Sequence, residues 1–163
     1  MFMRKRKVQR FKFSVVVVVV VVVGMTMAYL FPLNVVDGRS MLPTLCPGDV
    51  ILTSRLSKVN RDIVVGFLNY DAKKELVVKR VLAVEGDTIE IQKDKVIVND
   101  RIVYEDYTLD ATMKQTMKET TVETGKLFVL GDNRNDSCDS RSAGCMNADE
   151  CIGVVKRVIS TAH

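Results

Sequence analysis

The sequence has no histidine where a folded active site could use one. Its only histidine, His163, is the last of 163 residues, and a chain terminus is usually mobile. A Ser-His-Asp triad, a Cys-His pair and the common histidine-containing zinc sites all need an imidazole held inside a packed site. Hydrolytic chemistry in this chain therefore requires a base other than histidine.

Paired cysteine motifs are also lacking. The four cysteines, Cys46, Cys138, Cys145 and Cys151, show none of the CxxC spacing of zinc or thioredoxin-like centres, so we expect no metal and no cofactor. The last three lie close enough in sequence for a local disulfide in an oxidising compartment. Free thiols fit the sequence equally well, and the pairing is left open.

An excess of basic over acidic residues is lacking beyond the N-terminus. The net charge of +4 comes from the first thirteen residues, which hold Arg4, Lys5, Arg6, Lys7, Arg10 and Lys12; beyond Phe13 the charges nearly balance. A nucleic-acid partner would need basic residues spread over a folded surface, so none is expected. This distribution is typical of a membrane flank.

A long uncharged run follows the basic cluster. Residues 14–31 carry no charge, include nine consecutive valines and precede Pro32. A helix of this length spans about 27 Å, close to the ~30 Å hydrocarbon core of a bilayer. We therefore predict a cytoplasmic segment at 1–13, a single transmembrane anchor at 14–31 and an extracytoplasmic domain at 32–163.

The apolar run has two other interpretations. A cleaved secretory signal would have the same basic flank, with Thr26-Met27-Ala28 as a loosely A-x-A-like site. Cleavage after Ala28 would leave Ser40 only a dozen residues from a frayed terminus, and the run exceeds a typical signal core. A buried core helix fits poorly with the basic flank, so the anchor is favoured.

The remainder indicates an all-β domain. Short β-branched runs are separated by Gly, Asp, Asn and Lys, and Asn99-Asp100 predicts a hairpin turn. Residues 105–124 are polar, with no evident apolar face, and are predicted to be a surface segment. Many short strands indicate a small folded-sheet or barrel-like domain. The predicted strands are 49–52, 62–68, 75–84, 88–91, 95–98, 102–104, 126–130 and 152–159.

Three segments carry candidate chemistry. Ser40 lies in a Gly- and Pro-bounded loop, where a turn serine that bonds its own backbone is the simpler interpretation. Lys79 lies among apolar strand residues, where burial could bring its pKa toward the 7–8 of a useful base, unless it points outward. The loop 131–141 offers hydroxyls to orient an amine, and Asp139 and Arg141 could pair within it.

These segments, taken in order, resemble the bacterial type I signal peptidases over essentially the whole chain. Besides the N-terminal anchor, the matching features are Ser40-Met41-Leu42-Pro43-Thr44-Leu45, Asp62-Ile63-Val64-Val65, Lys79-Arg80-Val81 with Gly86-Asp87, and Gly131 to Arg141. The last block matches the family pattern GDNRxxSxDSR at every specified position. The chain departs from the family at Arg61, where glycine is usual, and at residues 83–85, which alters the turn after that strand.

The resemblance implies a Ser-Lys peptidase with a two-lobed all-β domain on the outer face of the membrane. Ser40 would be the acylated nucleophile, and Lys79 would take its proton and later activate water. Ser137 would position the lysine amine. Asp139 and Arg141 would form a supporting salt bridge. The backbone N–H of Ser40 would hold the oxyanion, with help from the backbone at Gly38.

The same resemblance implies the substrate. Signal peptides of exported preproteins would bind as an extended strand beside Val35, Val36, Asp37 and Gly38, with small residues one and three positions before the cut. Val36, Ile51 and Val77 are the expected pocket walls. The lipid bilayer and the secretion translocon are the other expected partners.

Two rival functions fit the sequence less well. A self-cleaving Ser-Lys repressor would carry a DNA-binding helical unit where this chain has valines. An anchored accessory or pilus-assembly protein without catalysis would not need both Ser40 and Lys79.

Overall fold

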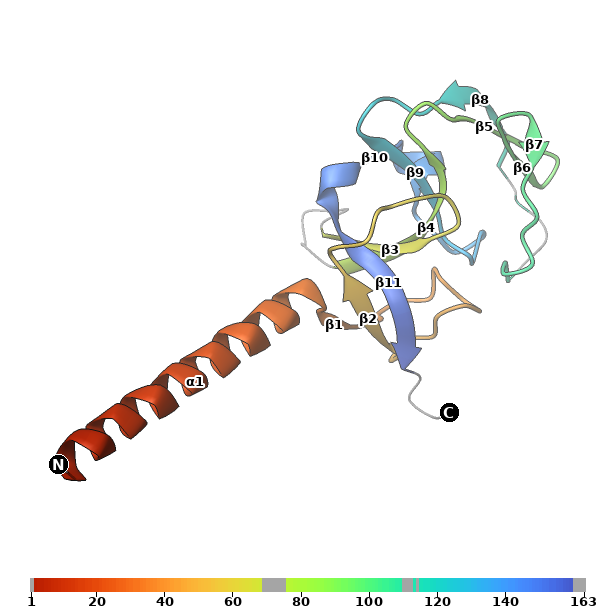
Figure 1. The fold of residues 1–163 in the computed structure, drawn as a ribbon. Coiled ribbons are helices and arrows are strands. Elements are labelled where there is room, and N and C mark those ends of the chain that lie inside the picture. The colour runs from red at the N-terminus through yellow and green to blue at the C-terminus, as the bar shows by residue number, and fades with distance from the viewer. Residues whose placement is uncertain (1, 69–75, 110–112, 114, 160–163) are drawn as a thin grey trace. The chain divides into compact units, whose positions relative to one another are not determined.

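The computed structural model describes residues 2–68, 76–109, 113 and 115–159 (Figure 1). The chain divides into two compact units, Met1–Pro32 and Leu33–His163. His163 and Glu75, the first residue of one predicted strand, lie outside the described residues.

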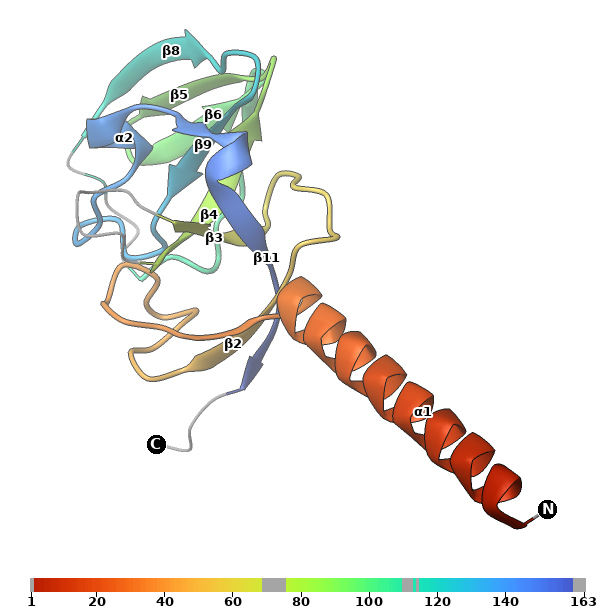
Figure 2. The same ribbon diagram turned by 90° about the vertical axis from the view of Figure 1, so that its left-hand side faces the viewer.

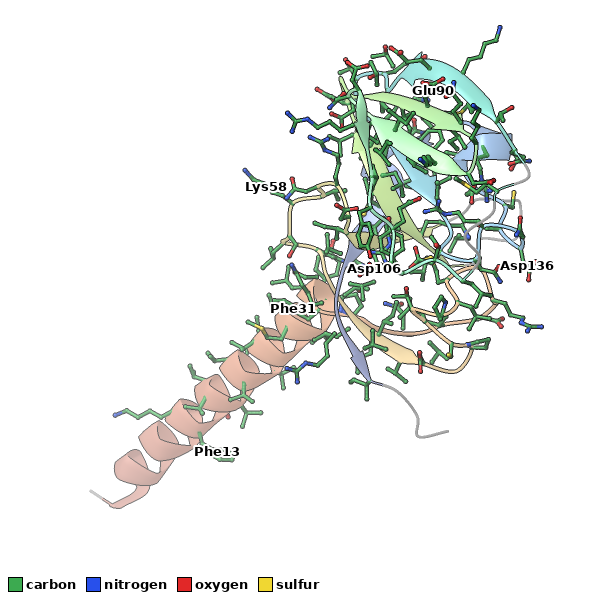
Figure 3. The ribbon with its side chains drawn as sticks, turned by 90° about the vertical axis from the view of Figure 1, so that its right-hand side faces the viewer. Phe13, Phe31, Lys58, Glu90, Asp106 and Asp136 are labelled. Carbon is green, nitrogen blue, oxygen red and sulfur yellow. The ribbon has the colours of Figure 1, made fainter. Side chains whose placement is uncertain are left out.

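The first unit is one helix, α1, from Phe2 to Leu30. Its portion Lys12–Leu30 has a mean hydropathy of 2.6, none of it is buried, and it is long and apolar enough to cross a membrane. Figure 3 shows the exposed Phe13 projecting from this helix. Within α1, Thr26 Oγ1 donates to the Val22 carbonyl at 2.8 Å, which satisfies the hydroxyl internally. An apolar helix of this kind suits a single span, since lipid offers no other partner for its backbone.

The second unit contains a seven-stranded sheet whose paired strands are all antiparallel. The β-branched runs expected from the sequence supply its central strands. In spatial order the strands are β1 (Leu33–Val35), β2 (Val50–Ser54), β11 (Cys151–Ile159), β3 (Val64–Leu68), β4 (Leu76–Val84), β9 (Lys126–Leu130) and β10 (Met146–Asn147).

A smaller sheet forms the end of this unit opposite β1 and β2 (Figure 1 and Figure 2). Figure 3 labels Glu90 on it. The unit also holds one short helix, α2 (Ser140–Ala143), and a 3-10 turn at Ala148–Glu150. The strands of the smaller sheet, in spatial order, are β7 (Arg101–Ile102), β6 (Lys95–Val98), β5 (Thr88–Gln92) and β8 (Met117–Thr121). The predicted all-β class, with one N-terminal apolar helix, is confirmed.

The polar segment 105–124 differs from its prediction. It contributes β8 to the small sheet, and Met113 and Val122 are buried in the adjacent core, at 6% and 1% exposed. The prediction that this segment has no apolar face was wrong. The reason is that β8 itself is largely exposed, whereas the two buried residues lie just outside the strand. A search for alternating apolar residues along a strand therefore misses them.

Apolar packing fixes the loop that carries Ser40. Met41 and Leu45, just beyond the serine, are 2% and 1% exposed and pack in one core cluster with Val36, Ile51 and Val78. Full burial of such a side chain stabilises by about 1.5–3 kcal/mol. The loop is therefore held against the sheet on which Lys79 lies.

Candidate active site

Ser40 and Lys79 meet in the structure although 39 residues separate them. Lys79 lies on β4, paired with the fully buried Val65 of β3. Ser40 lies in the turn anchored by Met41 and Leu45. Lys79 Nζ donates a hydrogen bond to Ser40 Oγ at 2.7 Å. That distance allows direct proton transfer between the two groups.

The environment of Lys79 favours its neutral form. The residue is 3% exposed, and this burial lowers the pKa of its amine from the ordinary 10.5. The negative charge of Asp139 acts in the opposite direction but does not cancel the effect of burial. Since a neutral amine has a free lone pair, Lys79 has the character of a general base.

The loop after β9 holds the main chain around the nucleophile. The Asn133 N–H donates to the Ser40 carbonyl at 3.0 Å, and Asn133 Nδ2 donates to the Arg39 carbonyl at 3.1 Å. A Cβ added at Gly131 would lie 2.5 Å from the Ser40 carbonyl oxygen and would overlap Ser137 Oγ. Glycine is therefore required at position 131 for close approach.

Ser137 does not make the bond that the sequence suggested. Its Oγ is buried and makes no hydrogen bond of normal geometry to a described residue, but it lies near enough to the Asp139 carboxylate to help lower the pKa of that group. The hydroxyl lies against Gly131, close to the Ser40 main chain. The predicted hydrogen bond from Ser137 to the Lys79 amine is thus not formed in this structure.

Asp139 and Arg141 form the ion pair that their spacing suggested. Arg141 Nε and Nη2 each donate to the Asp139 carboxylate at 2.7 Å. The Gly131 N–H donates to the same carboxylate at 3.1 Å, and Asp139 also caps α2. Burial alone would raise the pKa of Asp139, but the hydrogen bonds from Arg141 and Gly131 lower it. The carboxylate therefore stays charged and, through its hydrogen bonds, links Gly131 at the start of the loop 131–141 to Arg141 at its end.

A second buried ion pair lies beside the first and was not predicted. Arg80 Nε and Nη2 donate to the Asp132 carboxylate at 2.8 and 2.7 Å, and Thr44 Oγ1 donates to it at 2.5 Å. Burial disfavours the charge of Arg80, but the hydrogen bonds and charge of Asp132 raise its pKa. A signal was present, because an arginine within an apolar strand needs a buried acidic partner.

The residues expected to contact substrate differ in exposure. Val35, on the edge strand β1, is 64% exposed, and Asp37 and Gly38 are also exposed. Gly38 has a φ of +91°, in the region that favours glycine. Their roles stay predictions.

The expected pocket walls are more enclosed. Val36 is 5% exposed, Ile51 has no exposed surface and Val77 is half-buried. Contact between Ile51 and a substrate would thus require this core to open.

The four cysteines are free thiols. Within the described ranges no cluster of His, Cys, Asp and Glu could hold a metal ion.

Comparison with known proteins identifies the family to which the chain is similar. The family model for signal peptidase, peptidase S26, matches residues 8–160. Signal peptidase I of Bacillus caldolyticus is 36% identical over 145 residues, which cover 78% of each chain. Signal peptidase I P of Bacillus subtilis subsp. natto is 32% identical, over 82% of this chain and 80% of that protein.

A solved structure agrees with these matches. The crystal structure of a signal peptidase I from Enterococcus faecalis is 29% identical, with a TM-score of 0.54, and covers 61% of this chain and 98% of that one. The chain belongs to the signal peptidase family, peptidase S26, and is a serine endopeptidase of that family.

Proposed function

We propose that this chain is a membrane-bound endopeptidase that cleaves signal peptides from exported preproteins after small-x-small sites, with Ser40 as nucleophile and Lys79 as general base. The main support is the 2.7 Å contact between Ser40 Oγ and an Nζ whose pKa is lowered by burial. The family membership supports the reaction class and the substrate.

The proposed first step is acylation. Neutral Lys79 accepts the hydroxyl proton of Ser40 as Oγ attacks the scissile carbonyl carbon. The oxyanion that forms is held by the backbone N–H of Ser40, with help from the backbone at Gly38. Collapse of this intermediate breaks the peptide C–N bond, and protonated Lys79 returns the proton to the leaving amine.

The proposed second step is hydrolysis of the acyl-enzyme. Lys79, neutral again, takes a proton from water, and the hydroxide attacks the ester carbonyl. The ester C–O bond breaks and the proton returns to Ser40 Oγ. Ser137, whose buried hydroxyl makes no hydrogen bond of normal geometry to a described residue, would orient the Lys79 amine when a substrate fills the site.

The substrate would add to the main sheet as an extended strand. β1 is an edge strand paired with β2, and the chain continues from it through Val36 and Asp37 toward the nucleophile. Backbone hydrogen bonds along Val35, Val36 and Asp37 would give affinity. Shallow pockets walled by Val36 and Val77 would select small side chains, and the fully buried Ile51 would join them only if this core opened.

The proposed topology places residues 1–13 in the cytoplasm and the peptidase unit on the outer face, according to the basic flank of α1. The bilayer and the secretion translocon would then be its neighbours. Protease added outside intact cells should digest the peptidase unit, whereas complete protection would reverse this orientation.

The test of the dyad uses the full chain in detergent and a preprotein with an Ala-x-Ala site. Ser40→Ala and Lys79→Met should each abolish cleavage, with losses of about 10⁴-fold or more. Ser57→Ala and the exposed Lys58→Met (Figure 3) are matched controls that should keep full activity. Cleavage by purified Ser40→Ala at the native rate would disprove the assignment.

A further inference from the structure

Residues 105–109, part of the polar segment before β8, contact the loop that holds the nucleophile. The Arg134 guanidinium donates through Nη1 to Glu105 Oε2 at 2.9 Å and through Nη2 to Glu105 Oε1. Arg134 Nε donates to the Gly131 carbonyl at 3.0 Å. The Arg134 side chain is 1% exposed and that of Glu105 is 10% exposed, so this ion pair is nearly free of solvent.

Tyr107 connects this ion pair to the other side of the site. Its hydroxyl donates to Glu105 Oε1 at 3.0 Å. The Arg80 guanidinium lies 3.7 Å from the centre of the Tyr107 ring, in a cation–π contact. One short segment therefore contacts two buried arginines at once.

Each arginine is the sequence neighbour of a residue that contacts Ser40. Arg80 is next to Lys79 on β4 and is paired with Asp132. Arg134 lies one residue beyond Asn133, whose N–H holds the Ser40 carbonyl. The Leu109 N–H adds a third link, because it donates to the Asp132 carbonyl at 3.1 Å.

We propose that Glu105 and Tyr107 are positioning residues that hold Ser40 and Lys79 at reacting distance. They do so through Arg134 and Arg80. This inference rests on the proposed Ser40–Lys79 dyad. Neither residue touches the reacting atoms, so their contribution is to geometry.

The physical reason is the burial of the two arginines. The Arg134 guanidinium has almost no contact with water, so without Glu105 it must move to find another partner. Because its Nε also binds the Gly131 carbonyl, such a movement displaces the loop next to Ser40. The rate of peptide cleavage is sensitive to such a displacement, because a misplacement of the reacting groups by about 1 Å can lower the rate ~10²-fold.

The test measures kcat and KM for preprotein cleavage by the full chain in detergent, well below the melting temperature of each variant. Glu105→Gln keeps the size of the side chain but removes its charge, and we expect kcat to fall about 10- to 100-fold with KM within about twofold. Tyr107→Phe keeps the ring over Arg80 and loses only the bond to Glu105, so its loss should be smaller. Asp106→Asn, at an exposed neighbour (Figure 3), is the matched control and should be unchanged.

The outcomes separate the two proposals. A folded Glu105→Gln with native kcat, beside an inactive Ser40→Ala, overturns the positioning role alone. Native activity in Ser40→Ala overturns the proposed dyad. A kcat that recovers completely on cooling shows a purely structural role and also contradicts the inference. If Glu105→Gln does not fold, Tyr107→Phe decides, because an unchanged kcat in that variant overturns the proposal.

Discussion

Lys79 and Arg80 are adjacent on β4 and both are buried, yet their surroundings shift their pKa values in opposite directions. Burial lowers the pKa of Lys79, whose amine contacts a neutral hydroxyl. The pKa of Arg80 is raised, because its guanidinium is matched by the Asp132 carboxylate and covered by the Tyr107 ring. Successive strand residues face opposite sides, so one strand separates the proposed general base from an ion-paired arginine. Burial is common to both residues, and the lack of a full counter-charge is what distinguishes Lys79.

The largest expected effect comes from giving position 79 the chemistry of position 80. Lys79→Arg introduces a side chain that stays charged at any working pH and cannot accept a proton. Cleavage of a preprotein should fall about 10⁴-fold or more. Steady-state kinetics with purified protein provide the measurement, and appreciable cleavage by this variant would contradict the role of Lys79 as base.

The second-largest effect is expected from removing the counter-charge of Arg80. Asp132→Asn removes the carboxylate from a site with no solvent exposure, and we expect a loss of about 3–5 kcal/mol in unfolding free energy. Denaturant unfolding measures it. Asp136→Asn, at an exposed aspartate in the same loop (Figure 3), should change stability by less than about 0.5 kcal/mol. Equal stability of the two variants would show that the pair contributes little.

A third substitution, at Gly131, acts on the loop 131–141, which contains Asp132 and also contacts the main chain of Ser40. Gly131→Ala places a methyl group 2.5 Å from the Ser40 carbonyl oxygen, so the loop must move away from the nucleophile. We expect kcat to fall about 10- to 100-fold, since orientation of the dyad is disturbed. A native kcat would mean that the loop relaxes without moving Ser40.

The pH dependence should distinguish the two cations. Below its ordinary pKa of 10.5 the unfolded chain binds a proton at Lys79 that the folded chain binds less readily, so stability rises with pH between the lowered pKa and 10.5. Lys79→Met should remove this slope and be more stable than the native chain at neutral pH. Activity of the native chain should rise with pH as the amine becomes neutral. Unfolding measured at several pH values tests this, and Lys58→Met should retain the slope.

The smallest expected effect is at Ser137. Because its buried Oγ makes no hydrogen bond of normal geometry and only assists the Asp139 carboxylate, Ser137→Ala should change unfolding free energy by only about 1 kcal/mol. Its kcat should still decrease, by less than the ~10²-fold typical of a lost oxyanion donor, if the hydroxyl orients Lys79 in the complex. An unchanged kcat would limit Ser137 to packing.

The sequence by itself determined the apolar helix, the β class and the residues of the candidate dyad. The helix and the β class depend on local properties, namely hydropathy along one segment and β-branched runs between turn residues. Ser40 and Lys79 lie 39 residues apart, and each was identified by its own short motif in the order that the family shows. The absence of a usable histidine likewise excluded histidine as the general base.

Only the tertiary structure decided which charges are matched between segments far apart in the sequence. Asp132 is 52 residues from Arg80, and Glu105 is 29 residues from Arg134. Any of the chain's twenty acidic side chains could have been the partner of either arginine. The choice depends on which segments the two sheets bring into contact, and the polar segment 105–109 gives no local sign of its buried position. For the same reason the depressed pKa of Lys79 could be suspected from its apolar neighbours, but it follows only from the packing that excludes water and leaves its amine beside Ser40.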